Sequence, residues 1–145
     1  MTALTASRLV RELATATTRR LPVAANTNIY EGGMVALSGS GSSAVAVPAS
    51  ANAALKVVGI ALADQLNNPG VAGALSVDAK VGFFLMNNSS TDPVAIGDIG
   101  ATVYAQDDNT ISKTGAPASG SPTQPVAGTL FNIDAASGAA WVKFV

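Results

Sequence analysis

The chain has 145 residues, of which 48% are hydrophobic, 5% aromatic and 12% charged, and its formal net charge at pH 7 is −1. It contains no cysteine and no histidine, which excludes disulfides, thiolate zinc sites, cysteine nucleophiles and histidine general bases. No apolar run approaches the roughly 20 residues that span a membrane, and the N-terminus does not read as a signal peptide, so we expect one soluble domain made without Sec export.

Residues 1–20 differ from the rest of the chain. They hold four arginines against one glutamate, a formal charge of +3, which leaves −4 for the remaining 125 residues. Leu9, Val10 and Leu13 are compatible with one face of a short helix that Ser7 caps, whereas the threonines favour an extended segment. We therefore predict an N-terminal arm over residues 1–20 that contact with another surface orders, and a single domain over residues 21–145.

The pattern from residue 21 onward is typical of an all-β domain. Short apolar runs alternate with turn signals every 8–12 residues, which favours a small β-barrel or a β-sandwich. The segment 114–125 contains two glycines and three prolines and is predicted to be an exposed loop. Strands are expected at residues 28–37, 44–47, 56–63, 73–87, 99–105, 110–113, 126–133 and 140–145.

The stretch 73–87 shows the most regular alternation in the chain. Its odd positions are all apolar, so they are predicted to form one continuous core face. Charged residues and a glycine at even positions also allow two strands that are separated by an irregularity near Asp78–Lys80 or near Gly82. The apolar odd positions are Leu75, Val77, Ala79, Val81, Phe83 and Leu85.

The aromatic side chains all occur within predicted strands, and we expect them in the core rather than on a ligand-binding surface. These residues are Tyr30, Phe83, Phe84, Tyr104, Phe131, Trp141 and Phe144.

The sequence contains no pattern that is typical of a catalytic, metal or cofactor site. No Gly-Lys pair exists, so a P-loop is excluded. The Asp107-Asp108-Asn109 triplet lacks EF-hand spacing and is predicted to be a tight turn. The other aspartates also fall near turns, where they usually bond to the backbone. We therefore expect no enzyme activity, no cofactor and no small-molecule substrate.

The N-terminal arginines are the candidate binding residues. Arg8, Arg11, Arg19 and Arg20 occur without an aromatic residue among them, which is a weak nucleic-acid signature. Contact with an acidic protein surface is the better explanation. Since ordinary domains contain about twice this fraction of charged residues, the sparse charge also indicates that a partner covers part of the surface.

Five blocks, taken in order, carry a resemblance to a known family. They are LPVAANTNIYEGGMVAL (21–37), VVGIALADQLNN (57–68), LSVDAKVGFFLMNNS (75–89), IGDIGATVYAQDDNTIS (96–112) and VAGTLFNIDAASGAAWVKF (126–144). This succession resembles the small capsid decoration, or cement, proteins of tailed bacteriophages and related prophages. The specificity comes from the order and spacing of the blocks. Neither the arm nor the 114–125 loop takes part in the resemblance.

The resemblance implies a role on the outer surface of the virion. It implies a compact β-barrel or β-tulip domain, made in the bacterial cytoplasm, that sits as a homotrimer where several major capsid subunits meet. Such proteins clamp the expanded shell against the pressure of the packaged DNA. Their N-terminal arms commonly reach neighbouring subunits, which suits Arg8, Arg11, Arg19 and Arg20 as capsid contacts. The expected partners are the major capsid protein and further copies of the chain, without nucleic acid or membrane.

A second class of function stays open at this point. The same strand pattern fits a β-sandwich ligand-binding module, such as a carbohydrate-binding or adhesin domain. Those modules usually present exposed aromatic side chains, which the sequence places in strands instead. The position of the aromatic residues in the fold therefore bears on this alternative.

Overall fold

The computed structural model describes residues 17–116 and 120–145, and this part of the chain is all-β, as predicted. Two single-turn 3-10 helices, η1 (Gly41–Ser43) and η2 (Ile96–Asp98), lie between strands. The strands are β1 (Thr18–Pro22), β2 (Thr27–Ile29), β3 (Met34–Ser38), β4 (Val45–Pro48), β5 (Lys56–Ala61), β6 (Gln65–Asn67), β7 (Ser76–Lys80), β8 (Gly82–Asn88), β9 (Thr102–Ala105), β10 (Thr110–Ser112), β11 (Val126–Ile133) and β12 (Ala140–Phe144).

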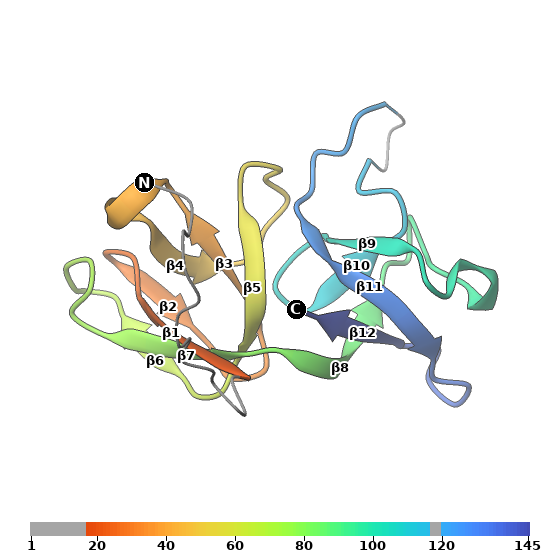
Figure 1. The fold of residues 1–145 in the computed structure, drawn as a ribbon, viewed down its shortest axis with the longest axis horizontal. Coiled ribbons are helices and arrows are strands. Elements are labelled where there is room, and N and C mark those ends of the chain that lie inside the picture. Colours follow the sequence, from red (N-terminus) through yellow and green to blue (C-terminus); the bar gives the residue numbers. More distant parts are fainter. Residues whose placement is uncertain (1–16, 117–119) are drawn as a thin grey trace, which may run out of the picture.

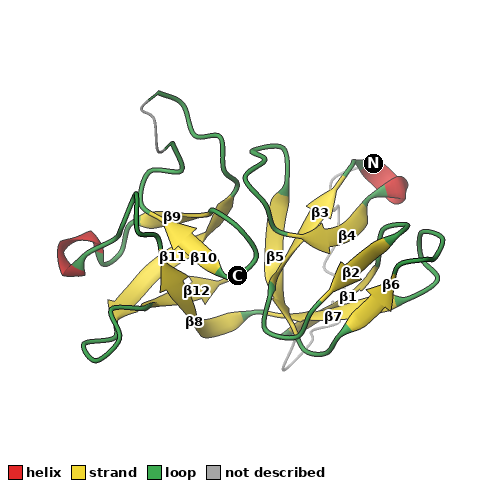
Figure 2. Cartoon of the chain, turned by 180° about the vertical axis from the view of Figure 1, so that it is seen from behind, coloured by secondary structure: helices red, strands yellow, loops and turns green. Residues whose placement is uncertain are grey.

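The strands form two lobes that lie side by side (Figures 1 and 2). The first lobe contains an antiparallel sheet in the order β1-β7-β5-β3-β4, together with the short antiparallel pair β2-β6. The second lobe is a closed barrel in the order β10-β8-β12-β11-β9, in which β10 and β8 run parallel. Closing the barrel leaves it without a free strand edge. The predicted small β-barrel is therefore present, with a second sheet beside it.

One hydrophobic core connects the two lobes. Met34 and Ile60 of the first lobe belong to the same buried cluster as Leu130, Val142 and Phe144 of the barrel. Burying each of the larger side chains stabilises the fold by about 1.5–3 kcal/mol. The first lobe also has a core of its own, made of the buried side chains Val23, Ile29, Val35, Ala46, Val58, Ala61, Val77 and Ala79.

The long apolar stretch at residues 73–87 is divided between the lobes. Val77 and Ala79 of β7 are buried, as predicted, but Phe83 and Leu85 of β8 are exposed and Met86 is buried instead. The expected continuous core face is therefore wrong at Leu75, which is 37% exposed, and again beyond residue 81, whereas the alternative of two strands separated near Gly82 is confirmed. Gly82 has φ +138°, in the region that favours glycine, and a one-residue irregularity sends every later side chain to the opposite face.

Strand β1 begins inside the segment that was expected to be the arm. Thr18 pairs with Lys80 and Leu21 pairs with Val77, so residues 18–20 belong to the first-lobe sheet. The edge of β7 supplies backbone hydrogen-bonding groups that β1 satisfies, which explains why residues 18–20 join the sheet. Residues 1–16 lie outside the described part. No helix in the described residues is long and apolar enough to cross a membrane.

Candidate protein-interaction surface

The outer side of the barrel carries a group of four exposed apolar side chains and one lysine. They come from three neighbouring strands: Phe83 and Leu85 from β8, Trp141 and Lys143 from β12, and Phe131 from β11. The strand register sets them side by side, because Trp141 lies opposite Leu85 and Lys143 lies opposite Phe83. We call these five residues the aromatic face.

Direct contacts order the aromatic face. The rings of Phe83 and Phe131 meet edge to face, with centroids 4.8 Å apart and an interplanar angle of 65°. The Lys143 Nζ atom lies 5.9 Å from the centroid of the Phe83 ring, within reach of a cation–π contact. An irregularity in the pairing of β11 with β12 occurs between Leu130 and Asn132, at the position of Phe131. The face is therefore a defined arrangement of rings around one cation.

The prediction that the aromatic side chains lie in the core is wrong for four of them. Phe131, Tyr30, Phe83 and Trp141 are 56%, 55%, 51% and 37% exposed, whereas Phe144 is buried. In β8 and β12 the alternate residues Phe84 and Phe144 pack into or against the barrel core, so Phe83 and Trp141 point outward.

The sequence held one signal for the exposed position of Trp141. In β12, Ala140, Val142 and Phe144 alternate with Trp141 and Lys143. Because a strand sends alternate side chains to opposite faces, Trp141 shares the face of a lysine. The charge of Lys143 therefore indicated that Trp141 faces solvent.

Two of the four arginines that the sequence singled out belong to the described structure. Arg8 and Arg11 lie outside the described residues, and Arg19 and Arg20 are neighbours on β1. Arg19 Nη1 donates to the carbonyl oxygens of Val58 at 2.7 Å and Val145 at 3.3 Å.

Arg20 makes a different contact from that of its neighbour. Its Nη1 atom lies 3.3 Å from Oδ1 of Asp78, which is its register partner on β7. Both described arginines therefore have partners within the fold, which was not expected of arm residues.

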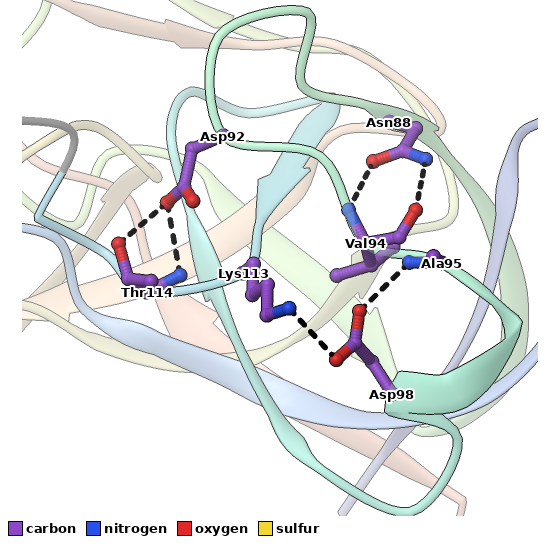
Figure 3. Close-up of polar contacts among 7 residues, drawn as sticks. All are labelled: Asn88, Asp92, Val94, Ala95, Asp98, Lys113 and Thr114. Atoms are coloured by element: carbon purple, nitrogen blue, oxygen red, sulfur yellow. Dashed lines mark hydrogen bonds and ion pairs between the residues drawn. The ribbon is translucent and has the colours of Figure 1, made fainter.

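A polar network connects the loops that follow β8 and β10 (Figure 3). The Asn88 side chain bonds to the backbone N–H and C=O of Val94 at 2.9 Å each. One carboxylate oxygen of Asp92 accepts bonds from the backbone N–H and the hydroxyl of Thr114, at 2.9 and 2.8 Å. These contacts join the loop after β8 to the loop after β10.

Asp98 belongs to the same network. Its carboxylate accepts the Ala95 N–H at 2.8 Å and lies 3.1 Å from Lys113 Nζ. These two contacts, the Ala95 bond foremost, hold the pKa of Asp98 below its ordinary value of 3.8. Asp98 is thus an ionised structural group with its partners in place.

The loop that was predicted at residues 114–125 has its base fixed by hydrogen bonds. The Gly115 carbonyl accepts the N–H groups of Thr123 at 2.8 Å and Gln124 at 3.2 Å. The Ser112 hydroxyl donates to the side-chain oxygen of Gln124, and both side chains are buried. In its described residues the segment contains no strand, but its exposure is limited to Thr114 and residues 120–123, because Ala116, Gln124 and Pro125 are buried.

The described surface contains cavities at the η1 turn and at the junction of the lobes. One, of about 430 Å³, is lined by Leu37, Ala54, Lys56 and the Gly39–Ala44 turn. The other, of about 310 Å³, is lined by Tyr30, Glu31, Gly32, Gly33, Asp108 and Asn109. Within residues 17–116 and 120–145, no three histidine, cysteine or acidic side chains lie close enough together to hold a metal ion.

Asp108 differs from the other acids of the described chain. Burial, and secondarily the charge of Asp107, raise the pKa of the Asp108 carboxyl above its ordinary value. Its backbone carbonyl accepts the Met34 N–H at 2.6 Å, so the 107–109 turn is tied to the start of β3. The turn that the sequence predicted is therefore present at the junction of the two lobes.

Comparisons with known proteins leave the family open, because no protein-family model, no curated protein and no solved structure matches the chain.

Proposed function

We propose that this protein is a structural virion protein that decorates and stabilises the expanded capsid of a tailed bacteriophage. It binds as a trimer on the outer surface of the head, where major capsid subunits meet. The order of the five sequence blocks supports the phage setting. The single observation that supports a role in an assembly is the aromatic face, because ordered apolar groups on a closed barrel favour contact with other protein surfaces.

The composition of the surrounding strands favours a protein partner. Strands β8, β11 and β12 contain no aspartate or glutamate, and Lys143 is their one charged residue. Depletion of charge around exposed aromatic residues is characteristic of the centre of a protein–protein interface. The proposed role is structural, so it requires neither catalytic residues nor a cofactor.

The N-terminal arm is the proposed contact with the shell. Since Arg19 and Arg20 have partners within the first lobe, Arg8 and Arg11 are the arginines that this role assigns to capsid contact. A single exposed ion pair contributes less than about 1 kcal/mol. Three arms on one trimer act together, because the release of one arm leaves the other two bound.

Binding to expanded heads of the phage that encodes the chain tests the proposal. The full chain is expected to co-sediment with heads and to raise the temperature at which they release DNA. A variant that lacks residues 1–16 keeps all of β1 and is expected to bind more weakly, as is Arg8→Ala/Arg11→Ala. Lys56→Ala, an exposed change at the start of β5, is the matched control. A full chain that leaves heads undecorated would rule out the proposed function.

A carbohydrate-binding module is the second candidate, and one observation favours it. Trp141, Phe83 and Phe131 are exposed, whereas the sequence placed them in the core, and sugar sites often use such rings. Glycan-array binding that Trp141→Ala abolishes would support this candidate. It is the weaker candidate because the surrounding strands offer sugar hydroxyls amide and hydroxyl acceptors but no carboxylate, which is the stronger acceptor.

A further inference from the structure

We propose that copies of this chain associate head to tail, so that the aromatic face of one copy packs on the outer face of the β2-β6 pair of the next copy. This inference deepens the proposed function, in which the chain acts as a homo-oligomer, by naming the two surfaces that meet. The supporting observation is that two exposed, mainly apolar faces lie on different lobes, and that one contains a cation and the other an anion.

The first of these surfaces is the aromatic face, which contains a cation without an acidic neighbour on its own strands. Lys143 is the one charged side chain of β8, β11 and β12. A partner that covers Phe83, Phe131 and Trp141 would also desolvate the ammonium group, so the partner has to supply a carboxylate. The aromatic face therefore fits an apolar surface that carries an acid.

The second surface has this character. We call it the Leu66 face and define it by Tyr30, Asp64 and Leu66. Leu66 pairs with Asn28 on β2, and alternation from these two positions sends Tyr30 and Asp64 to the same outer side. Tyr30 and Leu66 are 55% and 56% exposed, and Asp64 is exposed as well.

The carboxylate of the Leu66 face is fixed in place by the backbone. Asp64 Oδ1 accepts the backbone N–H of Glu31 at 2.8 Å. That bond orients the carboxylate and uses Oδ1, and no bond to Oδ2 occurs within residues 17–116 and 120–145. Glu31, which is also exposed, adds a second negative charge beside the face.

A symmetric contact between two aromatic faces fits the charges poorly. It would bring two Lys143 ammonium groups together on strands that contain no carboxylate, and like charges in an interface are unfavourable. The aromatic face and the Leu66 face belong to different lobes and share no residue (Figure 1). Contact between unlike faces of identical copies is heterologous, and it forms a closed ring when the rotation between copies closes.

A second exposed apolar surface, around Asp98, is less suitable than the Leu66 face as the partner of the aromatic face. Ile96 and Ile99 are 74% and 47% exposed and flank Asp98. The Asp98 carboxylate already accepts the Ala95 N–H and pairs with Lys113. Taking Asp98 for an intermolecular contact would break an existing pair, which the Asp64 contact does not require.

A charge-swap experiment on the full chain tests the inference. Mass by light scattering is measured over a range of protein concentrations, together with the fluorescence of Trp141, the only tryptophan in the chain. The wild-type chain is expected to form a discrete oligomer, with a blue shift of Trp141 emission on association. Lys143→Glu and Asp64→Lys are each expected to weaken association by roughly tenfold, and the double variant is expected to recover most of that loss.

Two further variants keep the test decisive. Leu66→Ser changes an exposed residue away from the barrel and is expected to weaken association by at least about tenfold, whereas the matched control Lys56→Glu is expected to leave it unchanged. Circular dichroism checks that each variant is folded. A wild-type chain that stays monomeric at every concentration, or a double variant no better than the single ones, would overturn the inference.

The inference and the proposed function fail in distinguishable ways. The chain could bind heads while it remains monomeric in solution, with binding that Leu66→Ser does not change. That result would overturn the head-to-tail contact and leave the decoration role. An oligomer that responds to the charge swap but leaves expanded heads undecorated would support the contact and overturn the decoration role.

Discussion

Asp98 connects a 3-10 turn to the strand-end lysine Lys113, and its ionisation is linked to folding. The Ala95 N–H and the Lys113 ammonium lower the pKa of Asp98 in the folded chain. The stability that this provides is present above the ordinary aspartate value of 3.8 and is lost as the pH falls through the lower folded value. Asp98→Asn is therefore expected to lower the melting temperature at about pH 7 and to approach the wild type in acid. Melting curves across the acid range measure this convergence.

The ionisation of Asp108 changes the stability of the fold in the opposite direction to that of Asp98. Its folded pKa is raised, first by burial and then by Asp107, so its contribution to stability is present below 3.8 and is lost as the pH rises through the raised value. Asp108→Asn keeps the shape of the side chain and removes the cost of holding a partly buried charge. We expect this variant to melt higher than the wild type near neutral pH and to lose that advantage in acid. A variant that melts lower at neutral pH would show that the charge itself is needed.

Gly59 of β5 and Gly82 of β8 differ in how much space a Cβ atom would have. Gly59 has φ +147°, and a Cβ atom there would lie 2.7 Å from the Lys80 carbonyl oxygen. Gly82 has φ +138°, but the nearest atom to its Cβ would be Phe84 Cε2 at 3.8 Å. Gly82→Ala is expected to cost about 1–3 kcal/mol from backbone strain, and Gly59→Ala is expected to cost more because the sheet backbone has to move. Urea unfolding compares the two, and an equal cost would contradict the steric argument.

The two arginines of β1 are expected to contribute unequally to the attachment of this strand. Arg20 and Asp78 have side chains that are 72% and 41% exposed, so their ion pair is expected to contribute less than about 1 kcal/mol. Arg19 donates to carbonyl oxygens of β5 and of the C-terminal residue, and its loss is expected to cost about 1–2 kcal/mol, because a carbonyl loses a charged donor. Denaturant unfolding of Arg19→Ala and Arg20→Ala measures the difference. A larger effect at Arg20 would reverse this ranking.

The shared core predicts that the two lobes unfold together. Met34 and Ile60 of the first lobe are buried in one cluster with Leu130 of the barrel. Far-UV circular dichroism, which reports on both lobes, and Trp141 fluorescence, which reports on the barrel, are expected to give the same midpoint. Leu130→Ala is expected to lower both midpoints equally, at a cost of about 2–5 kcal/mol. A second dichroism transition without a fluorescence change would mean that the first lobe is independent.

Alternation and turn chemistry by themselves determined the class of fold. The regular alternation in β7 and β12 and the turn at 107–109 each follow from interactions between residues close in sequence. The base of the 114–125 loop follows in the same way, because its glycines and prolines exclude a strand. The exposed position of Trp141 was also within reach, since it shares a strand face with Lys143.

Only the tertiary structure decided which strand faces are covered and which residues form the candidate surface. Alternation shows that Phe83 and Phe84 point to opposite sides, but only the closed barrel, with Phe84 packed against its core, shows that Phe83 is outside. The partners of Arg19 lie 39 and 126 residues away and that of Arg20 lies 58 residues away, so no local pattern could reveal them. Such contacts form only when distant strands pair, which explains why local patterns indicated the class of fold and many of its strands but not the surface that the strands form.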